Sequence, residues 1–187
     1  MSYVSLVPGY SNPAPGVRGK PASHPCLEAF RQEFDYLIRT LRRLGVPGQD
    51  VEDLAHEVFL VLHRTWNSYD PTRSLRAYLF GIAFKVSCSH FRKSKREFAR
   101  EAIEIQDLGP RPDQEVETSQ QRSLLLKAIE QVSLRPRAVL VMHDIDEMPM
   151  VEIAANLSIP RFTAYSRLRR ARKELMAAVA VIFRTNS

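Results

Sequence analysis

Apolar side chains recur at three- and four-residue intervals along most of this chain, which is the period of an amphipathic α-helix. The first such repeat occupies residues 27–44 and runs through Leu27, Phe30, Phe34, Leu37, Ile38, Leu41 and Leu44. The same spacing predicts further helices over residues 50–66, 75–94, 123–132, 136–145, 149–157 and 161–183. No stretch of useful length shows the two-residue alternation of a strand. The pattern therefore predicts an all-α protein.

Turn and capping residues separate the predicted helices. Gly45 and the residues after it end the first helix, and Asp50 is the expected N-cap of the second. A turn at Asp70-Pro follows the second helix, and Ser74 can cap the third. Gly81 lies inside the third helix, where glycine costs about 1 kcal/mol. We expect it to allow the close approach of another helix.

Charge and composition change abruptly after the third helix. That helix ends in the basic residues Lys85, Arg92, Lys93, Lys95, Arg96 and Arg100. Residues 101–117 then carry six acids and one base, with two prolines among them. Such a shift is typical of a linker between domains. We expect two small helical domains, 26–97 and 119–184, joined by a flexible acidic linker, 98–118. They would follow a disordered Pro- and Gly-rich arm, 1–25.

The last two predicted helices form a helix-turn-helix pattern. Ala154 must be small because the second helix crosses close to it, and Ile159 plugs the turn. Residues 161–173 hold six basic side chains and no acid, which suits a helix lying in the major groove of DNA. The expected base or groove contacts are Arg161, Thr163, Tyr165, Ser166 and Arg169. The expected phosphate contacts are Arg167, Arg170 and Lys173.

The net charge of +6 favours a polyanionic partner, either nucleic acid or an acidic membrane surface. We expect no membrane insertion, because the apolar stretch 176–183 has eight residues and a span needs roughly 20. The start of the chain lacks the features of a signal peptide. Cys26 and Cys88 match no zinc or CxxC spacing. Together these features predict a cytoplasmic protein.

Nothing in the sequence favours an enzyme. His56 and His63 are seven residues apart, whereas a helical zinc site places its histidines four apart. Neither a GxxxxGK[ST] nor a GxGxxG phosphate loop occurs, and no serine or cysteine has a convincing His/Asp partner pattern. We therefore expect no catalytic residues, no metal and no cofactor.

Several segments, taken together, resemble a known family. Residues 132–140 (VSLRPRAVL), 152–154 (EIA), 157–160 (LSIP) and 166–175 (SRLRRARKEL) look like region 4 of the extracytoplasmic-function (group IV) sigma factors. Residues 53–59 (DLAHEVF) resemble the region 2 motif that docks on RNA polymerase. Residues 76–83 (RAYLFGIA) and 91–96 (FRKSKR) resemble the segment that opens the −10 element. The resemblance covers roughly residues 26–183.

The resemblance implies a sigma factor that directs core RNA polymerase to promoter DNA, with an anti-sigma factor as a further expected partner. It implies a polymerase interface at Asp53, Glu57, Val58 and Phe59. The loop 68–74 would hold a flipped base of the −10 strand through residues that include Ser68, Asp70 and Arg73. Along that strand would lie Tyr78, Lys85, Arg92 and Lys93. The helix over 161–183 would read the −35 element.

Two positions depart from the family pattern. Lys85 replaces a frequent asparagine, which exchanges a base-reading amide for a point charge. Phe162 stands where the family usually has glycine at the start of the recognition helix. These departures bear on −10 and −35 preference respectively.

Two other functional classes also fit parts of the sequence. A helix-turn-helix regulator that binds duplex DNA alone accounts for residues 136–176 and leaves the region 2 motif unexplained. An interaction protein that binds polymerase without reading DNA leaves the basic helix unexplained. The acidic stretch 101–117 could also shield the basic faces while the protein is free, with the two domains mobile relative to each other.

Overall fold

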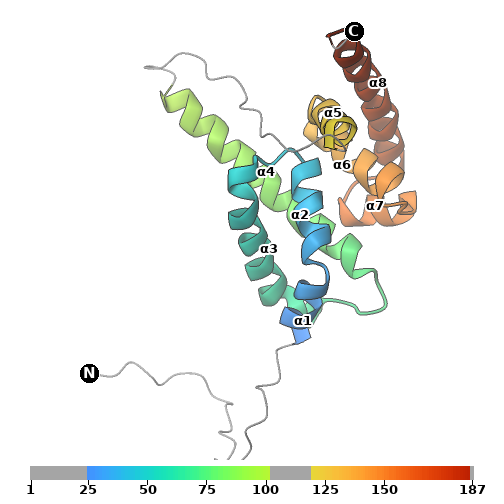
Figure 1. The fold of residues 1–187 in the computed structure, drawn as a ribbon. Coiled ribbons are helices and arrows are strands. Elements are labelled where there is room, and N and C mark those ends of the chain that lie inside the picture. The colour runs from blue at the N-terminus through green and yellow to red at the C-terminus, as the bar shows by residue number, and fades with distance from the viewer. Residues whose placement is uncertain (1–24, 102–118, 186–187) are drawn as a thin grey trace, which may run out of the picture.

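The computed structural model describes residues 25–101 and 119–185, and every regular element in these two stretches is helical. The prediction of an all-α fold is confirmed. Figure 1 shows the arrangement of the eight α-helices of the described residues. They are α1 (Pro25–Gln32), α2 (Phe34–Arg43), α3 (Val51–Thr65), α4 (Leu75–Glu101), α5 (Ser119–Glu130), α6 (Leu134–Leu140), α7 (Met150–Asn156) and α8 (Arg161–Thr185). Three short turns complete them: η1 (Gly48–Asp50), η2 (Trp66–Ser68) and η3 (Val141–Ile145), a π-helical turn that continues α6.

Two differences from the predicted helix boundaries bear on the domain organisation. The first predicted helix is divided into α1 and α2 at Glu33, whose carboxylate lies 2.8 Å from the Nε of Arg76 in α4. Helix α4 continues to Glu101, so it includes the first residues of the predicted linker. The remainder of that linker and the predicted N-terminal arm, up to residue 24, lie outside the described residues.

One of the two expected caps is confirmed and one is wrong. The hydroxyl of Ser74 accepts a hydrogen bond from the backbone N–H of Ala77 at 3.3 Å, as a helix N-cap should. Asp50 makes no side-chain cap for α3. Its carboxylate lies 3.4 Å from the Nε2 of His90 instead, which ties the start of α3 to α4.

The first half of the molecule is a bundle in which α2 and α3 pack side by side against α4 (Figure 1). The amphipathic stripes read from the sequence face one another. Their fully buried members include Leu37, Leu41, Val58, Leu62 and Leu79. Burial of each such side chain contributes roughly 1.5–3 kcal/mol, so this shared core positions the exposed faces of α3 and α4.

In the second half, α5, α6 and α7 all pack against α8. The buried side chains of this half include Val139, Leu140, Ile153, Ala164 and Leu168. Pro136 lies in the first turn of α6, where its missing N–H costs no helical hydrogen bond. This core therefore holds one side of α8 and leaves the other side exposed.

The two halves pack on each other, whereas the sequence predicted domains that move independently. Helix α7 lies against α4, and the buried residues of both halves form one continuous apolar cluster. Helix α7 approaches α4 at Gly81, as expected, and a Cβ built there would lie 3.5 Å from the carbonyl oxygen of Asn156. That distance is ordinary van der Waals contact, so an alanine at this position would also fit.

Buried Arg137 joins the halves through backbone carbonyls. Its Nε and Nη2 donate to the carbonyl of Val132 at 2.9 and 2.7 Å, and Nη2 also donates to the carbonyl of Glu130. Its Nη1 reaches the carbonyl of Leu44, the C-cap of α2, at 2.7 Å. Burial lowers the pKa of Arg137. One cation thus satisfies the carbonyl ends of α5 and α2, where the helix dipoles favour positive charge.

A second polar contact, which we call the clasp, consists of Tyr36, Arg43 and Asp146. The hydroxyl of Tyr36 donates to Asp146 Oδ2 at 2.7 Å, and Arg43 Nη1 lies 3.2 Å from Oδ1. The Asp146 side chain is 8% exposed, and this desolvation raises its pKa despite the two donors. Desolvation and the charge of Asp146 raise the pKa of Tyr36 as well. Both carboxylate oxygens of Asp146, which belongs to the second half, are therefore bound by side chains of α2.

We expect Asp146→Ala to loosen the contact between the halves. The substitution leaves the buried Tyr36 hydroxyl without its acceptor, which costs about 1–3 kcal/mol. The measurement is hydrogen exchange of the backbone amides in α7 and in the facing part of α4, with exposed Glu152→Ala on α7 as the control. Equal protection in both variants would contradict a role for the clasp.

The clasp also predicts a pH dependence. Because the pKa of Asp146 is raised in the closed form, this form binds more protons than an opened one. Packing of the halves should therefore be tightest below the ordinary aspartate pKa. It should weaken as the pH rises through the raised value. Asp146→Asn should remove this component of the pH profile.

Candidate nucleic-acid interface

The helix-turn-helix predicted from the sequence is present as α7, a tight turn and α8. The amide of Ser158 donates to the carbonyl of Ala155 at 3.2 Å, and that of Ile159 donates to the carbonyl of Ala154 at 3.0 Å. With Ser158 at φ 52°, this is the Schellman pattern that ends a helix. Ala154 is buried and Ile159 packs against the core, as expected. The turn therefore fixes the direction in which α8 leaves.

Helix α8 has sharply different faces. Successive side chains are 100° apart, which places Ala164, Leu168 and Ala171 on one side, and all three are buried. The opposite stripe is exposed. It consists of Phe162, Ser166, Arg169 and Lys173, and we call it the outer stripe. Tyr165, which is 53% exposed, lies beside it. This stripe is the part of α8 that can enter a groove.

The predicted −35 contacts do not all lie on this face. The exposed members are Arg161, Tyr165, Ser166, Arg169, Arg170 and Lys173. Thr163 and Arg167 are half-buried, and the hydroxyl of Ser166 donates to the carbonyl of Thr163 at 2.9 Å. Desolvation and the charge of Arg135 lower the pKa of Arg167. Arg167 therefore lies at the edge of the exposed face of α8, near Arg135 of α6.

Two other arginines of α8 form ion pairs with acidic side chains of the second half. Arg170 Nε lies 2.6 Å from Glu174, and the other oxygen of Glu174 accepts the Ser133 amide at the start of α6. These bonds, with Arg170 first, lower the pKa of Glu174. Arg172 binds both oxygens of Asp144 at 3.0 and 2.7 Å, which lowers the pKa of that carboxyl. Arg169 and Lys173 are thus the basic side chains of the outer stripe.

In the first half, the loop predicted to hold a flipped base adjoins an aromatic cluster. The ring centroids of Trp66 and Tyr69 are 5.4 Å apart and nearly parallel. Those of Tyr69 and Tyr78 are 5.1 Å apart. The sequence prediction named Tyr78 and missed Trp66 and Tyr69. Their three-residue spacing directly before the Asp70-Pro turn was the signal for them.

Hydrogen bonds within and around this loop fix its shape. Three of the predicted DNA contacts, Ser68, Asp70 and Arg73, take part in these bonds. Asp70 accepts from the backbone N–H and the hydroxyl of Thr72, at 3.0 and 2.7 Å, and these bonds lower its pKa. The hydroxyls of Tyr69 and Tyr78 donate to the carbonyl of Arg73 and the hydroxyl of Thr65. The half-buried ring of Tyr78 therefore packs within the loop. Ser68 is exposed, and its hydroxyl donates to a backbone carbonyl.

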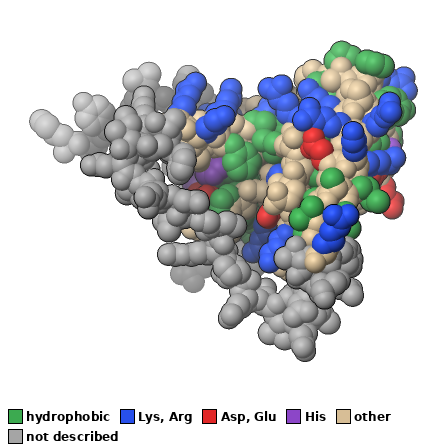
Figure 2. Space-filling view, turned by 90° about the horizontal axis from the view of Figure 1, so that it is seen from above, with side chains coloured by type: hydrophobic (Ala, Val, Ile, Leu, Met, Phe, Trp, Pro, Cys, Tyr) green, Lys and Arg blue, Asp and Glu red, His purple; other side chains and the backbone are tan. Residues whose placement is uncertain are grey.

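The predicted basic contacts of α4 are all exposed. Lys85, Arg92 and Lys93 lie on the half of the helix that leads to its basic end, and Arg92 Nε donates to the carbonyl of Cys88 at 3.3 Å. Figure 2 shows that Lys and Arg side chains predominate over Asp and Glu on the face of the molecule seen from above. Such a surface suits a polyanion.

Helix α3 presents a different, partly acidic face. Asp53 and Glu57 are exposed one turn apart, but Val58 is fully buried and Phe59 packs on Phe30 with ring centroids 4.9 Å apart. The expectation that Val58 offers a contact surface is therefore wrong for this arrangement of the chain. Leu60, which is 46% exposed, lies on the same side as the two acids and was missed.

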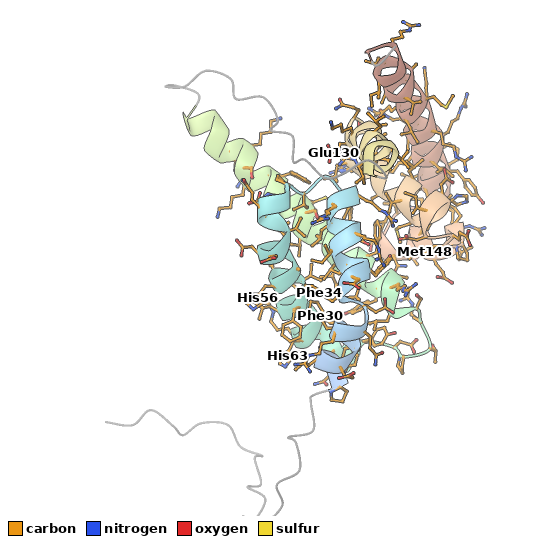
Figure 3. The ribbon with its side chains drawn as sticks, in the orientation of Figure 1. Phe30, Phe34, His56, His63, Glu130 and Met148 are labelled. Carbon is orange, nitrogen blue, oxygen red and sulfur yellow. The ribbon has the colours of Figure 1, made fainter. Side chains whose placement is uncertain are left out.

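The two histidines of α3, His56 and His63, are both exposed. Figure 3 shows His56 and His63 along the outer side of the helix, whereas Phe30 and Phe34 lie where α1 meets α3. Within residues 25–101 and 119–185, no three His, Cys, Asp or Glu side chains are grouped so that they could bind a metal ion. The same stretches contain no helix that could span a membrane.

Comparison with known proteins gives two family matches in the expected order. Residues 29–97 match Sigma-70 region 2, and residues 122–175 match Sigma-70, region 4. The chain is 27% identical to the RNA polymerase sigma factor CnrH of Cupriavidus metallidurans, over 75% of this chain and 79% of that protein. It is 26% identical to the ECF RNA polymerase sigma factor SigW of Bacillus subtilis, over 67% of this chain and 73% of that protein.

A solved structure shares the fold. The sigma factor RpoE from Bartonella quintana, in complex with the anti-sigma factor NepR, aligns with a TM-score of 0.63 at 24% identity. The alignment covers 82% of this chain and 98% of that one. Sigma factors in general are not enzymes. Both family matches and these relatives lead to one conclusion: the chain belongs to the sigma-70 family, in its extracytoplasmic-function group, and directs promoter-specific transcription initiation by core RNA polymerase.

Proposed function

We propose that the two halves divide promoter recognition between them. The first half binds core polymerase through α3 and opens the −10 element with the loop 66–74 and α4, and the second half reads the −35 element with α8. The observation that carries this proposal is the outer stripe of α8. It opposes the buried side of the helix, within a segment of six basic side chains and no acid. A helix with one buried side and one basic side fits the major groove.

For the −10 element, the aromatic cluster and the basic helix supply complementary contacts. Unstacking a base costs a few kcal/mol, and stacking it on an aromatic ring returns about 1–3 kcal/mol. Trp66 and Tyr69 offer such rings next to the predicted base-binding loop. Lys85, Arg92 and Lys93 lie along α4, where they can meet phosphates of the opened strand.

Polymerase docking is assigned to the exposed face of α3. Asp53 and Glu57 give it negative charge, and Leu60 adds apolar surface between polar neighbours. This combination favours a basic partner surface with an apolar centre. We assign Asp53, Glu57 and Leu60 to the interface. Phe59 contributes through its packing on Phe30.

The double substitution Asp53→Lys and Glu57→Lys tests this division of roles. We expect it to weaken binding to core polymerase by at least tenfold, because two attractive charges become repulsive. Binding of the free protein to −35 duplex should stay unchanged, since α8 is untouched. A matched control, Glu28→Lys with Asp35→Lys, makes the same charge change on exposed positions of α1 and α2. Equal polymerase binding by both variants would remove α3 from the interface.

We also propose that the packed arrangement is the form without polymerase. Elements centred about 25 base pairs apart, as the names −10 and −35 imply, are separated by about 85 Å, at 34–36 Å per helical turn. In the packed arrangement α7 contacts both α4 and α8, so these two helices are separated there by roughly one helix diameter, about 10–12 Å. The halves must therefore separate, and the clasp must open, before both elements are bound.

The complex of RpoE with NepR supports an anti-sigma partner for this chain too. Such a partner would act by stabilising the closed arrangement or by covering the faces of α3 and α8. We place the protein in the cytoplasm, where core polymerase and promoter DNA are found. No catalytic step is assigned to it, because the polymerase carries out the chemistry.

A further inference from the structure

Phe162 is an apolar side chain in an unusual place. It is 84% exposed, more than any other large hydrophobic residue in the described part of the chain. A single exposed hydrophobic side chain is common on protein surfaces. Phe162, however, lies one turn before Tyr165, which is 53% exposed, so two aromatic side chains are presented side by side on α8. Exposed aromatic side chains are enriched at surfaces that become buried in a complex. The location of Phe162 in the first turn of α8 places it in the part of a recognition helix that reaches base edges.

The direction of Phe162 follows from the helix period. Ala164, Leu168 and Ala171 define the buried side of α8, and Phe162 lies on the opposite side. Phe162 is the first member of the outer stripe, one turn before Ser166. Any molecule that receives this stripe must therefore also receive the ring of Phe162.

The charges around Phe162 indicate what that molecule is. Arg169 and Lys173 continue the outer stripe, and Arg161 precedes the ring. With no acid between residues 161 and 173, the surface complements a phosphate backbone. Within a major groove, the apolar group that a base edge offers is the C5-methyl of thymine, and phenylalanine is among the side chains that contact it.

We propose that Phe162 determines part of the −35 specificity by packing against the C5-methyl group of one thymine. This inference rests on the proposed role of α8 as the −35 reader. It adds an apolar contact to an outer stripe whose other members, Ser166, Arg169 and Lys173, are polar or basic. The chemical group recognised is the C5-methyl group. At the same position, 5-methylcytosine should therefore bind more tightly than cytosine, which lacks this group.

The test first selects the −35 element from randomised duplex, using the full-length chain with core polymerase. Each thymine of the selected element is then replaced in turn by deoxyuridine, which removes only the methyl group. At one position we expect the wild type to bind about fourfold more weakly to uracil, the loss for one buried methyl group. Phe162→Ala should bind the thymine and uracil forms equally, and selection with this variant should lose the thymine preference there.

Two variants serve as controls. Met176→Ala removes another exposed apolar side chain of α8, which is 70% exposed and about 21 Å further along the helix. It should keep the wild-type ratio of thymine to uracil binding. Phe162→Leu, which retains an apolar side chain, should keep part of that ratio. Because Phe162 is exposed, neither substitution at this position should prevent folding.

The outcomes separate this inference from the function on which it rests. If the wild type selects no −35 element, the assignment of α8 fails and the inference fails with it. If an element is selected but no thymine methyl affects wild-type binding, the inference alone is wrong. It is also wrong if Phe162→Ala keeps the uracil penalty, or if that variant loses polymerase binding instead, which would place the ring on a protein surface.

Discussion

Replacing Arg167, Arg169 and Arg170 of α8 with alanine should abolish promoter-specific transcription. The three substitutions remove half of the basic side chains in residues 161–173. For every phosphate that α8 no longer neutralises, the slope of log affinity against log salt should become shallower by about 0.9. The measurements are run-off transcription with core polymerase and duplex binding at several salt concentrations.

The structure also predicts how the three single variants should rank. Arg169 belongs to the outer stripe, Arg170 shares its guanidinium with Glu174, and Arg167 is half-buried. Arg169→Ala should therefore cost most, roughly 5- to 150-fold if its contact is a bidentate base contact of about 1–3 kcal/mol. Arg167→Ala should cost least.

A matched triple variant removes three exposed arginines from the first half, Arg31, Arg39 and Arg42. It changes net charge by the same amount without touching α8, so it should keep the −35 preference. If both triple variants lose affinity equally, the effect is one of overall charge. That result would contradict a specific role for α8.

Arg137→Met should lower the free energy of unfolding by about 3 kcal/mol. The substitution keeps an apolar stem but leaves the buried carbonyls of Leu44, Glu130 and Val132 without their shared donor, and each unsatisfied buried group is costly. Chemical denaturation followed by circular dichroism measures the loss. Exposed Arg135→Met on the same helix is the control, and a loss as small as its own would show that the network contributes little.

Gly45 provides an independent check on the same network. Its φ of 87° lies in the left-handed region, and a Cβ there would collide with the Arg137 guanidinium. Gly45→Ala should therefore destabilise the wild type both by backbone strain and by displacing Arg137. In the Arg137→Met background the second cost disappears, so the double variant should lose less stability than the two single variants combined.

The sequence predicted the helices well because each carries an amphipathic stripe. The helical period also predicted the burial of a residue that the family motif places at an interface. Val58 was expected at the polymerase interface, yet the same residue belongs to the apolar stripe of its helix, and it is buried. Tyr78 stays a predicted DNA contact, and its ring packs on Tyr69 while its hydroxyl donates to Thr65 at the end of α3. Helical phase was the better guide at Val58.

The contact between the halves had no local signal. Tyr36 and Asp146 are 110 residues apart, and Arg137 is 93 residues from Leu44. No periodic pattern relates such positions, and the acidic segment between the halves favoured a prediction of independent domains. Asp50 failed as a cap for a similar reason, because its partner His90 comes from a distant helix. Long-range polar pairs of this kind are visible only in the folded chain.

The most direct test is transcription in vitro with purified protein and bacterial core polymerase on a genomic promoter library. We predict that transcripts start at a discrete set of promoters that share a −10 and a −35 element, and that they require this protein. The contradicting result is that no promoter is activated while the free protein binds duplex DNA specifically. The chain would then act as a helix-turn-helix regulator that binds DNA on its own.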